Sequence, residues 1–88
     1  MAVHVVSYDL RKPGRNYQSL YDRLSDWKAF RILESVWIIK SESKAIDICN
    51  DLRKYIDNGD GLLVAELTRN AAWCNLQGQS GDKLKQSF

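Results

Sequence analysis

An acidic residue that ends an apolar segment, with three cations directly after it, is the most chemically suggestive feature of this sequence. Residues 3–9 are mostly apolar and end on Asp9, and Arg11, Lys12 and Arg15 flank a Pro-Gly turn. One or two carboxylates, together with water and a substrate phosphate, are enough to hold Mg²⁺. Such a metal can generate the nucleophile that attacks a phosphodiester. Asp9 is therefore a candidate catalytic residue and metal ligand for Mg²⁺ or Mn²⁺. The alternative is that Asp9 accepts backbone N–H bonds in the turn that follows.

The three cations give a second candidate function to the same segment. Arg11, Lys12 and Arg15 can contact phosphates, which would contribute affinity that depends on salt and not on base sequence. The net charge is only +2, but residues 1–31 hold six Lys and Arg against three Asp and Glu. The positive excess therefore lies in the N-terminal third, where a solvated loop is the alternative interpretation.

The remaining chemistry of the sequence is sparse. His4 is the single histidine and stands in an apolar segment, which favours a structural role over that of a general base. Cys49 and Cys74 have neither disulfide-framework nor zinc-ligand spacing. Two isolated thiols without a secretory signal predict a cytoplasmic protein. No apolar stretch approaches the roughly 20 residues that span a bilayer, so no membrane partner is expected.

The periodicity of the chain predicts an α+β fold that positions these residues. Alternation and β-branched residues predict strands, and apolar spacing of three and four predicts helices. A tight hairpin is expected at Glu34-Ser35. A polar, Gly-containing composition predicts a flexible tail over residues 77–88, after one domain over residues 1–76. The expected elements are strand 3–9, helix 17–27, strands 29–33 and 35–40, helix 45–56, strand 62–67 and an extra fifth strand over 71–76.

This order is the split βαββαβ pattern of a ferredoxin-like fold. It predicts a four-stranded antiparallel sheet with both helices on one face. The opposite face would then need a cover, and a second subunit is the simplest candidate.

Several phrases of the sequence resemble a known family. They are "HVVSYDL" with its basic loop, "RILESVWIIKSES" and "LLVAEL". Residues 2–76 resemble the small CRISPR-associated Cas-two proteins and their relatives, the VapD-type ribonucleases and the SinR-like proteins. The SinR-like group is the most similar, because it shares the ordered YDL-x-x-PG-x-NY phrase that runs here from Tyr8 to Tyr17.

The resemblance implies a homodimer of ferredoxin-like subunits in which the fifth strand pairs with the partner's sheet. It implies that Asp9 faces its copy in the second subunit, and that the two hold a divalent metal. Arg31 matches the basic residue of the family's second strand and is expected to bind nucleic acid. The residues expected at the dimer interface are Tyr8, Ser35, Trp37 and Trp73.

Two functions from different classes remain open on the sequence, beside a dimeric structural protein that binds no ligand. The first is a homodimeric protein that binds RNA or DNA, with metal-dependent nuclease or endoribonuclease activity. The second is a non-catalytic module that binds a protein partner, such as a phage-defence, toxin-like or regulatory protein. The modest net charge and the apolar aromatic content favour the second reading, whereas the resemblance favours the first.

Overall fold

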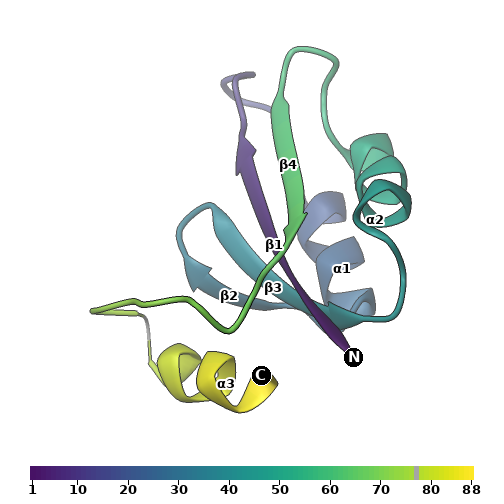
Figure 1. The fold of residues 1–88 in the computed structure, drawn as a ribbon. Coiled ribbons are helices and arrows are strands. Elements are labelled where there is room, and N and C mark those ends of the chain that lie inside the picture. The colour runs from purple at the N-terminus through teal and green to yellow at the C-terminus, as the bar shows by residue number, and fades with distance from the viewer. Residues whose placement is uncertain (77) are drawn as a thin grey trace.

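The computed structural model describes residues 1–76 and 78–88 and shows an α+β fold, with one four-stranded antiparallel sheet and three α-helices (Figure 1). The sheet order is β2-β3-β1-β4, which is compatible with a ferredoxin-like arrangement. The elements are β1 Ala2–Asp9, α1 Gln18–Asp26, β2 Phe30–Leu33, β3 Val36–Ser41, α2 Ala45–Leu52, the short 3-10 helix η1 Arg53–Tyr55, β4 Gly61–Glu66 and α3 Ser80–Ser87.

Strand β1 lies at the centre of the sheet, as its apolar residues on both faces predict. It pairs antiparallel with β3 on one side and with β4 on the other. The predicted hairpin at Glu34-Ser35 is confirmed, because β2 ends at Leu33 and β3 begins at Val36. The register places Asp9 opposite Gly61, so the end of β1 and the start of β4 lie at the same edge of the sheet.

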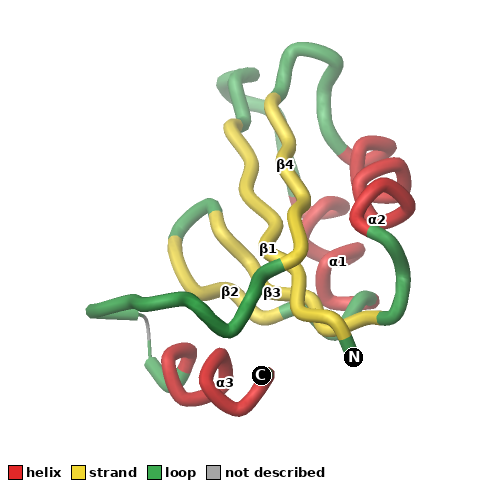
Figure 2. Tube along the Cα trace, in the orientation of Figure 1, coloured by secondary structure: helices red, strands yellow, loops and turns green. Residues whose placement is uncertain are grey.

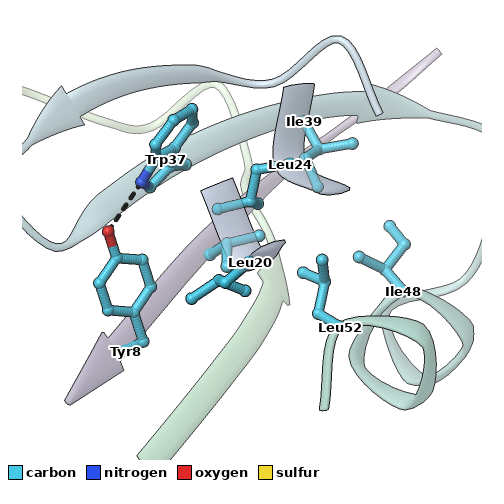
Figure 3. Packing of buried hydrophobic residues seen from close by; sticks show 8 residues of the cluster. Tyr8, Leu20, Leu24, Trp37, Ile39, Ile48 and Leu52 are labelled. Carbon is cyan, nitrogen blue, oxygen red and sulfur yellow. Dashed lines mark hydrogen bonds between the residues drawn. The ribbon is translucent and has the colours of Figure 1, made fainter. Parts of the chain in front are cut away.

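Helices α1 and α2 cover one face of the sheet and enclose the main core (Figure 3). The two helices contribute Leu20, Leu24, Ile48 and Leu52, each fully buried. Burial of one such side chain stabilises the fold by about 1.5–3 kcal/mol. The strands supply the other side of this core with Val6, Tyr8, Trp37 and Ile39.

The opposite face of the sheet is partly covered by α3, and here the predicted flexible tail differs from the structure. Residues 80–87 form a helix whose Leu84 is only 3% exposed and packs with Val3, Ile32 and Ile38. The polar composition of the tail concealed this helix, because Leu84 is its single apolar side chain between Ser80 and Ser87. The tail interpretation also included residue 77, which lies outside the described residues.

The expected fifth strand over residues 71–76 is absent from the described structure, which shows irregular chain there (Figure 2). The Leu67 N–H extends the ladder by donating to the Val3 carbonyl (2.7 Å), and the backbone then leaves the sheet. Residues 71–75 are exposed. A strand needs a neighbour to hydrogen-bond, and this segment has none within the described part of the chain. No helix among the described residues is long and apolar enough to cross a membrane.

Candidate nucleic-acid site at the end of strand β1

Asp9 lies at the exposed end of β1 and is bonded to a cation from its own loop. The Arg11 Nε donates to Asp9 Oδ2 at 2.9 Å, and the Asp9 side chain is 70% exposed. The same guanidinium donates from Nη1 to the Gly59 carbonyl at 3.1 Å. The carboxylate that the sequence suggested as a metal ligand therefore already has a charged partner.

The basic loop after β1 lies against an acidic loop that precedes β4. The Arg15 guanidinium donates to Asp57 Oδ1 at 2.5 Å, and the Lys12 ammonium lies 3.5 Å from Asp57 Oδ2. Antiparallel pairing of β1 with β4 brings these loops together, because the first strand ends where the other begins. The three cations predicted to contact phosphate thus each have an acceptor within the protein.

Asp60 joins the two loops through hydrogen bonds to backbone and side chain. It accepts the Arg11 N–H (2.7 Å), the Tyr17 hydroxyl (2.7 Å) and the Asp57 N–H (2.8 Å). Desolvation would raise the Asp60 pKa, but these donors outweigh it, and the net effect is a lowered pKa. Burial and the bond to Asp60 raise the pKa of the Tyr17 hydroxyl. The loop junction is therefore held by an ionised carboxylate.

These lowered carboxylate pKa values predict acid destabilisation. The pKa of Asp51 is also lowered, chiefly by the bidentate hydrogen bonds from Arg23 (2.7 and 3.0 Å). Since the unfolded chain protonates Asp near pH 4, it binds more protons than the folded chain in the acid range. These carboxylates are therefore expected to contribute to the free energy of unfolding above about pH 4. That contribution is lost as the pH falls through their lowered pKa values in the folded chain.

Urea unfolding across an acid pH series measures this effect. Asp60→Asn is expected to lower the free energy of unfolding near neutral pH. It should also reduce the loss of stability between neutral and acid pH, which we call the acid limb. Asp22→Asn is the matched control, since the exposed Asp22 side chain bonds to Gln18 on its own helix and to no other described residue. An unchanged acid limb in Asp60→Asn would contradict the role given to this carboxylate.

Arg31 on β2 differs from the other three cations because it has aromatic neighbours in place of acidic ones. Its guanidinium lies over the rings of Tyr21 and Trp37, 5.1 and 5.0 Å from their centroids. Its Nη2 donates to the Tyr8 hydroxyl at 3.1 Å, and this bond raises the Arg31 pKa above its ordinary value. The charge on this guanidinium is therefore permanent.

Among residues 1–76 and 78–88, Arg31 forms no ion pair, and its buried Nε has no hydrogen-bond partner. A guanidinium carries five donors and no acceptor. Stacking on two rings holds the plane of this group without neutralising it. Arg31 is thus a preorganised cation with unused donor capacity.

An open pocket of about 390 Å³ joins Arg31 to the end of β1. It combines one guanidinium, two carboxylates, two phenols and a small hydroxyl, on a wall formed by strands β1 and β2 and helix α1. Its lining residues are Tyr8, Asp9, Leu10, Tyr21, Arg31, Glu34 and Ser35. Asp9 and Arg31, which are separated by 22 positions in the sequence, therefore share one pocket.

The donor set of one chain supplies only part of a metal site. No group of three or more His, Cys, Asp or Glu that could hold a metal occurs among the described residues. Asp9 would have to exchange Arg11 for the metal, with the other ligands coming from water, phosphate or a second chain. The exposure of Asp9 makes its carboxylate accessible for that exchange.

The four residues expected at a dimer interface have different surroundings. Tyr8 and Trp37 are buried beneath α1, and the Trp37 Nε1 donates to the Tyr8 hydroxyl at 3.0 Å (Figure 3). Their rings face the helices because both residues stand on the helix-covered side of the register. They therefore belong to the core of one chain and offer little surface to a partner. Ser35 is half-buried in the hairpin, and Trp73 is 37% exposed.

The lone histidine and the cysteines have structural positions. His4 is 1% exposed, and its Nε2 lies 3.3 Å from the Ser41 carbonyl, in agreement with the structural role expected for it. Cys49 is half-buried, Cys74 is exposed, and neither forms a disulfide.

Sequence reasoning missed the partners of the expected site residues. These partners are Asp57 and Asp60 for the basic loop and Tyr21 for Arg31. The charge pattern of the sequence could have predicted these partners, since a basic loop follows the first strand and an acidic loop precedes the last. Strand pairing was needed to use it.

No protein-family model matches this chain, and no solved structure matches it.

Proposed function

We propose that this protein binds nucleic acid as a homodimer of ferredoxin-like βαββαβ subunits, of the Cas-two-like type. One observation carries the proposal: Arg31, which has no acidic partner among the described residues, presents its guanidinium to an open pocket that also contains Asp9. Planar guanidinium groups match the oxygens of a phosphate, and charge-assisted hydrogen bonds are about twice as strong as neutral ones.

The proposed binding mode gives Arg31 and the basic loop different roles. Arg31 is the primary phosphate contact, because its guanidinium has donors beyond the Nη2 that bonds to Tyr8 and its position is set by two rings. Lys12 is 62% exposed and its 3.5 Å contact with Asp57 is loose, so it can turn to a neighbouring phosphate. Arg11 and Arg15 mainly hold the two loops together, and contribute to the local positive potential.

We extend the proposal to metal-dependent cleavage of the bound strand. Asp9 would hold Mg²⁺ or Mn²⁺ together with Asp9 of a second copy, water and a substrate phosphate. A divalent cation at this position supplies Lewis-acid activation of a phosphodiester. Within one chain, Arg31 would orient the scissile phosphate, and Arg11 would release Asp9 when the metal binds.

A second candidate function is a non-catalytic module that binds a protein partner. The acceptors found for Arg11, Lys12 and Arg15 favour it, since paired cations contribute less to phosphate affinity. Exposed apolar side chains such as Leu63, at 58% exposure, also favour a protein partner.

A salt series distinguishes these functions. Fluorescence anisotropy with labelled single-stranded and double-stranded RNA and DNA is expected to show binding at low salt. Affinity should fall linearly with salt concentration on logarithmic axes, with a small slope of about 1–3 because few phosphates are contacted. Absence of binding to every polymer at low salt would contradict the nucleic-acid function and favour the protein-binding module.

A further inference from the structure

The sheet face that carries α3 is apolar beyond the footprint of this helix. Leu84 of α3 buries the part formed by Val3, Ile32 and Ile38. On the same face, Leu63 of β4 is 58% exposed, and its neighbour Ala65 is half-buried. The register places Leu63 beside Ser7 and Ala65 beside Val5, so the uncovered part continues directly from the covered part.

Helix α3 is held on this face by few contacts. It has eight residues, and its first residue is preceded by no side-chain cap. An isolated helix shorter than about 12 residues is marginal in water, so α3 depends on docking. That docking combines buried Leu84, the Ser80 hydroxyl bonded to the Arg31 carbonyl (2.9 Å) and Lys83 over the Phe30 ring. Phe88, directly after the helix, packs against the same apolar cluster.

We infer that α3 competes with a second copy of this chain for the sheet face. This inference rests on the homodimer of the proposed function and adds a control on its assembly. With α3 docked, a second copy can reach only the strip around Leu63. With α3 released, the whole face becomes available, and the two conditions should differ in the stability of the dimer.

Area favours a second copy as the occupant. A face four strands wide and about six residues long spans roughly 20 Å by 20 Å in projection. A standard interface takes about 800 Å² of accessible surface from each partner. The projected face is smaller than this area, but its corrugation and flanking side chains add accessible surface. The whole face therefore comes nearer to this area than the strip around Leu63 that α3 leaves uncovered. Two sheets pack well face to face, and a two-fold dimer uses the same patch twice.

Three full-length variants test the competition by analytical ultracentrifugation over a concentration series. Leu84→Asp is expected to release α3 and tighten the dimer by about tenfold or more relative to the wild type. Lys85→Asp is the matched control, because Lys85 is exposed on the same helix. It should leave the dissociation constant unchanged. Leu84→Asp combined with Leu63→Asp should be monomeric, because the second change puts a charge on the shared face.

Hydrogen exchange of the wild type provides a test without substitutions. Amides of residues 80–87 should exchange faster at high protein concentration, since the dimer excludes docked α3. A wild-type dimer in which α3 stays protected, or a Leu84→Asp dimer no tighter than the wild type, overturns the competition and leaves the proposed dimer intact. A monomer in every variant overturns both.

Discussion

Asp9→Ala is expected to reduce Mg²⁺- or Mn²⁺-dependent cleavage of RNA or DNA to background, with the fold retained. The Asp9 side chain is 70% exposed and, within the described part of the chain, bonds only to Arg11, so its loss removes a metal ligand without opening the core. The measurement is a gel assay of cleavage with each metal and with chelator. Circular dichroism and thermal unfolding of the same samples report on the fold.

Arg11→Ala is the informative companion, because it removes the cation that bonds to Asp9. If Asp9 exchanges Arg11 for the metal, this variant should need a lower metal concentration for half-maximal cleavage. Equal cleavage by the wild type and by clean Asp9→Ala protein would exclude Asp9 from the mechanism. Absence of cleavage by the wild type with either metal would contradict the nuclease proposal. The salt series would still test nucleic-acid binding independently.

The elements with strong periodicity were predictable from the sequence, and the C-terminal region was not. Strand β1, the hairpin at Glu34-Ser35 and the two helices over one face follow from alternation and from apolar spacing. Helix α3 carries one buried apolar residue, Leu84, so its helical character depends on a sheet face made by distant strands. The expected strand over residues 71–76 lacks a neighbour within the described chain, and propensity alone cannot supply one.

The candidate site shows the same division between local and tertiary information. Asp9 was identifiable as an acid at a strand end and Arg31 from the family resemblance, but their shared pocket depends on the pairing of β1, β3 and β2. The acidic partners of the basic loop depend on the pairing of β1 with β4. The types of residue in the sequence can therefore suggest a phosphate-binding loop. Strand pairing is needed to show which cation has no acidic partner among the described residues.

That difference between the cations leads to a second large expected effect. Arg31→Ala should weaken nucleic-acid binding by about 10- to 100-fold, because a hydrogen bond to a charged group contributes roughly 1.5–3 kcal/mol. Arg31→Lys keeps the charge but loses the planar group stacked on Tyr21 and Trp37, and should recover only part of the affinity. Anisotropy titrations at several salt concentrations measure both variants.

The salt slope separates a phosphate contact from a structural role. Loss of one phosphate contact lowers the slope by about 1, whereas partial unfolding lowers the active fraction without changing it. Arg53→Ala is the matched control, since Arg53 is exposed and lines a different pocket. If Arg31→Ala and Arg53→Ala weakened binding equally with the same slope, the affinity would come from the general positive charge of the chain. The stacked guanidinium would then serve only to hold β2 against α1.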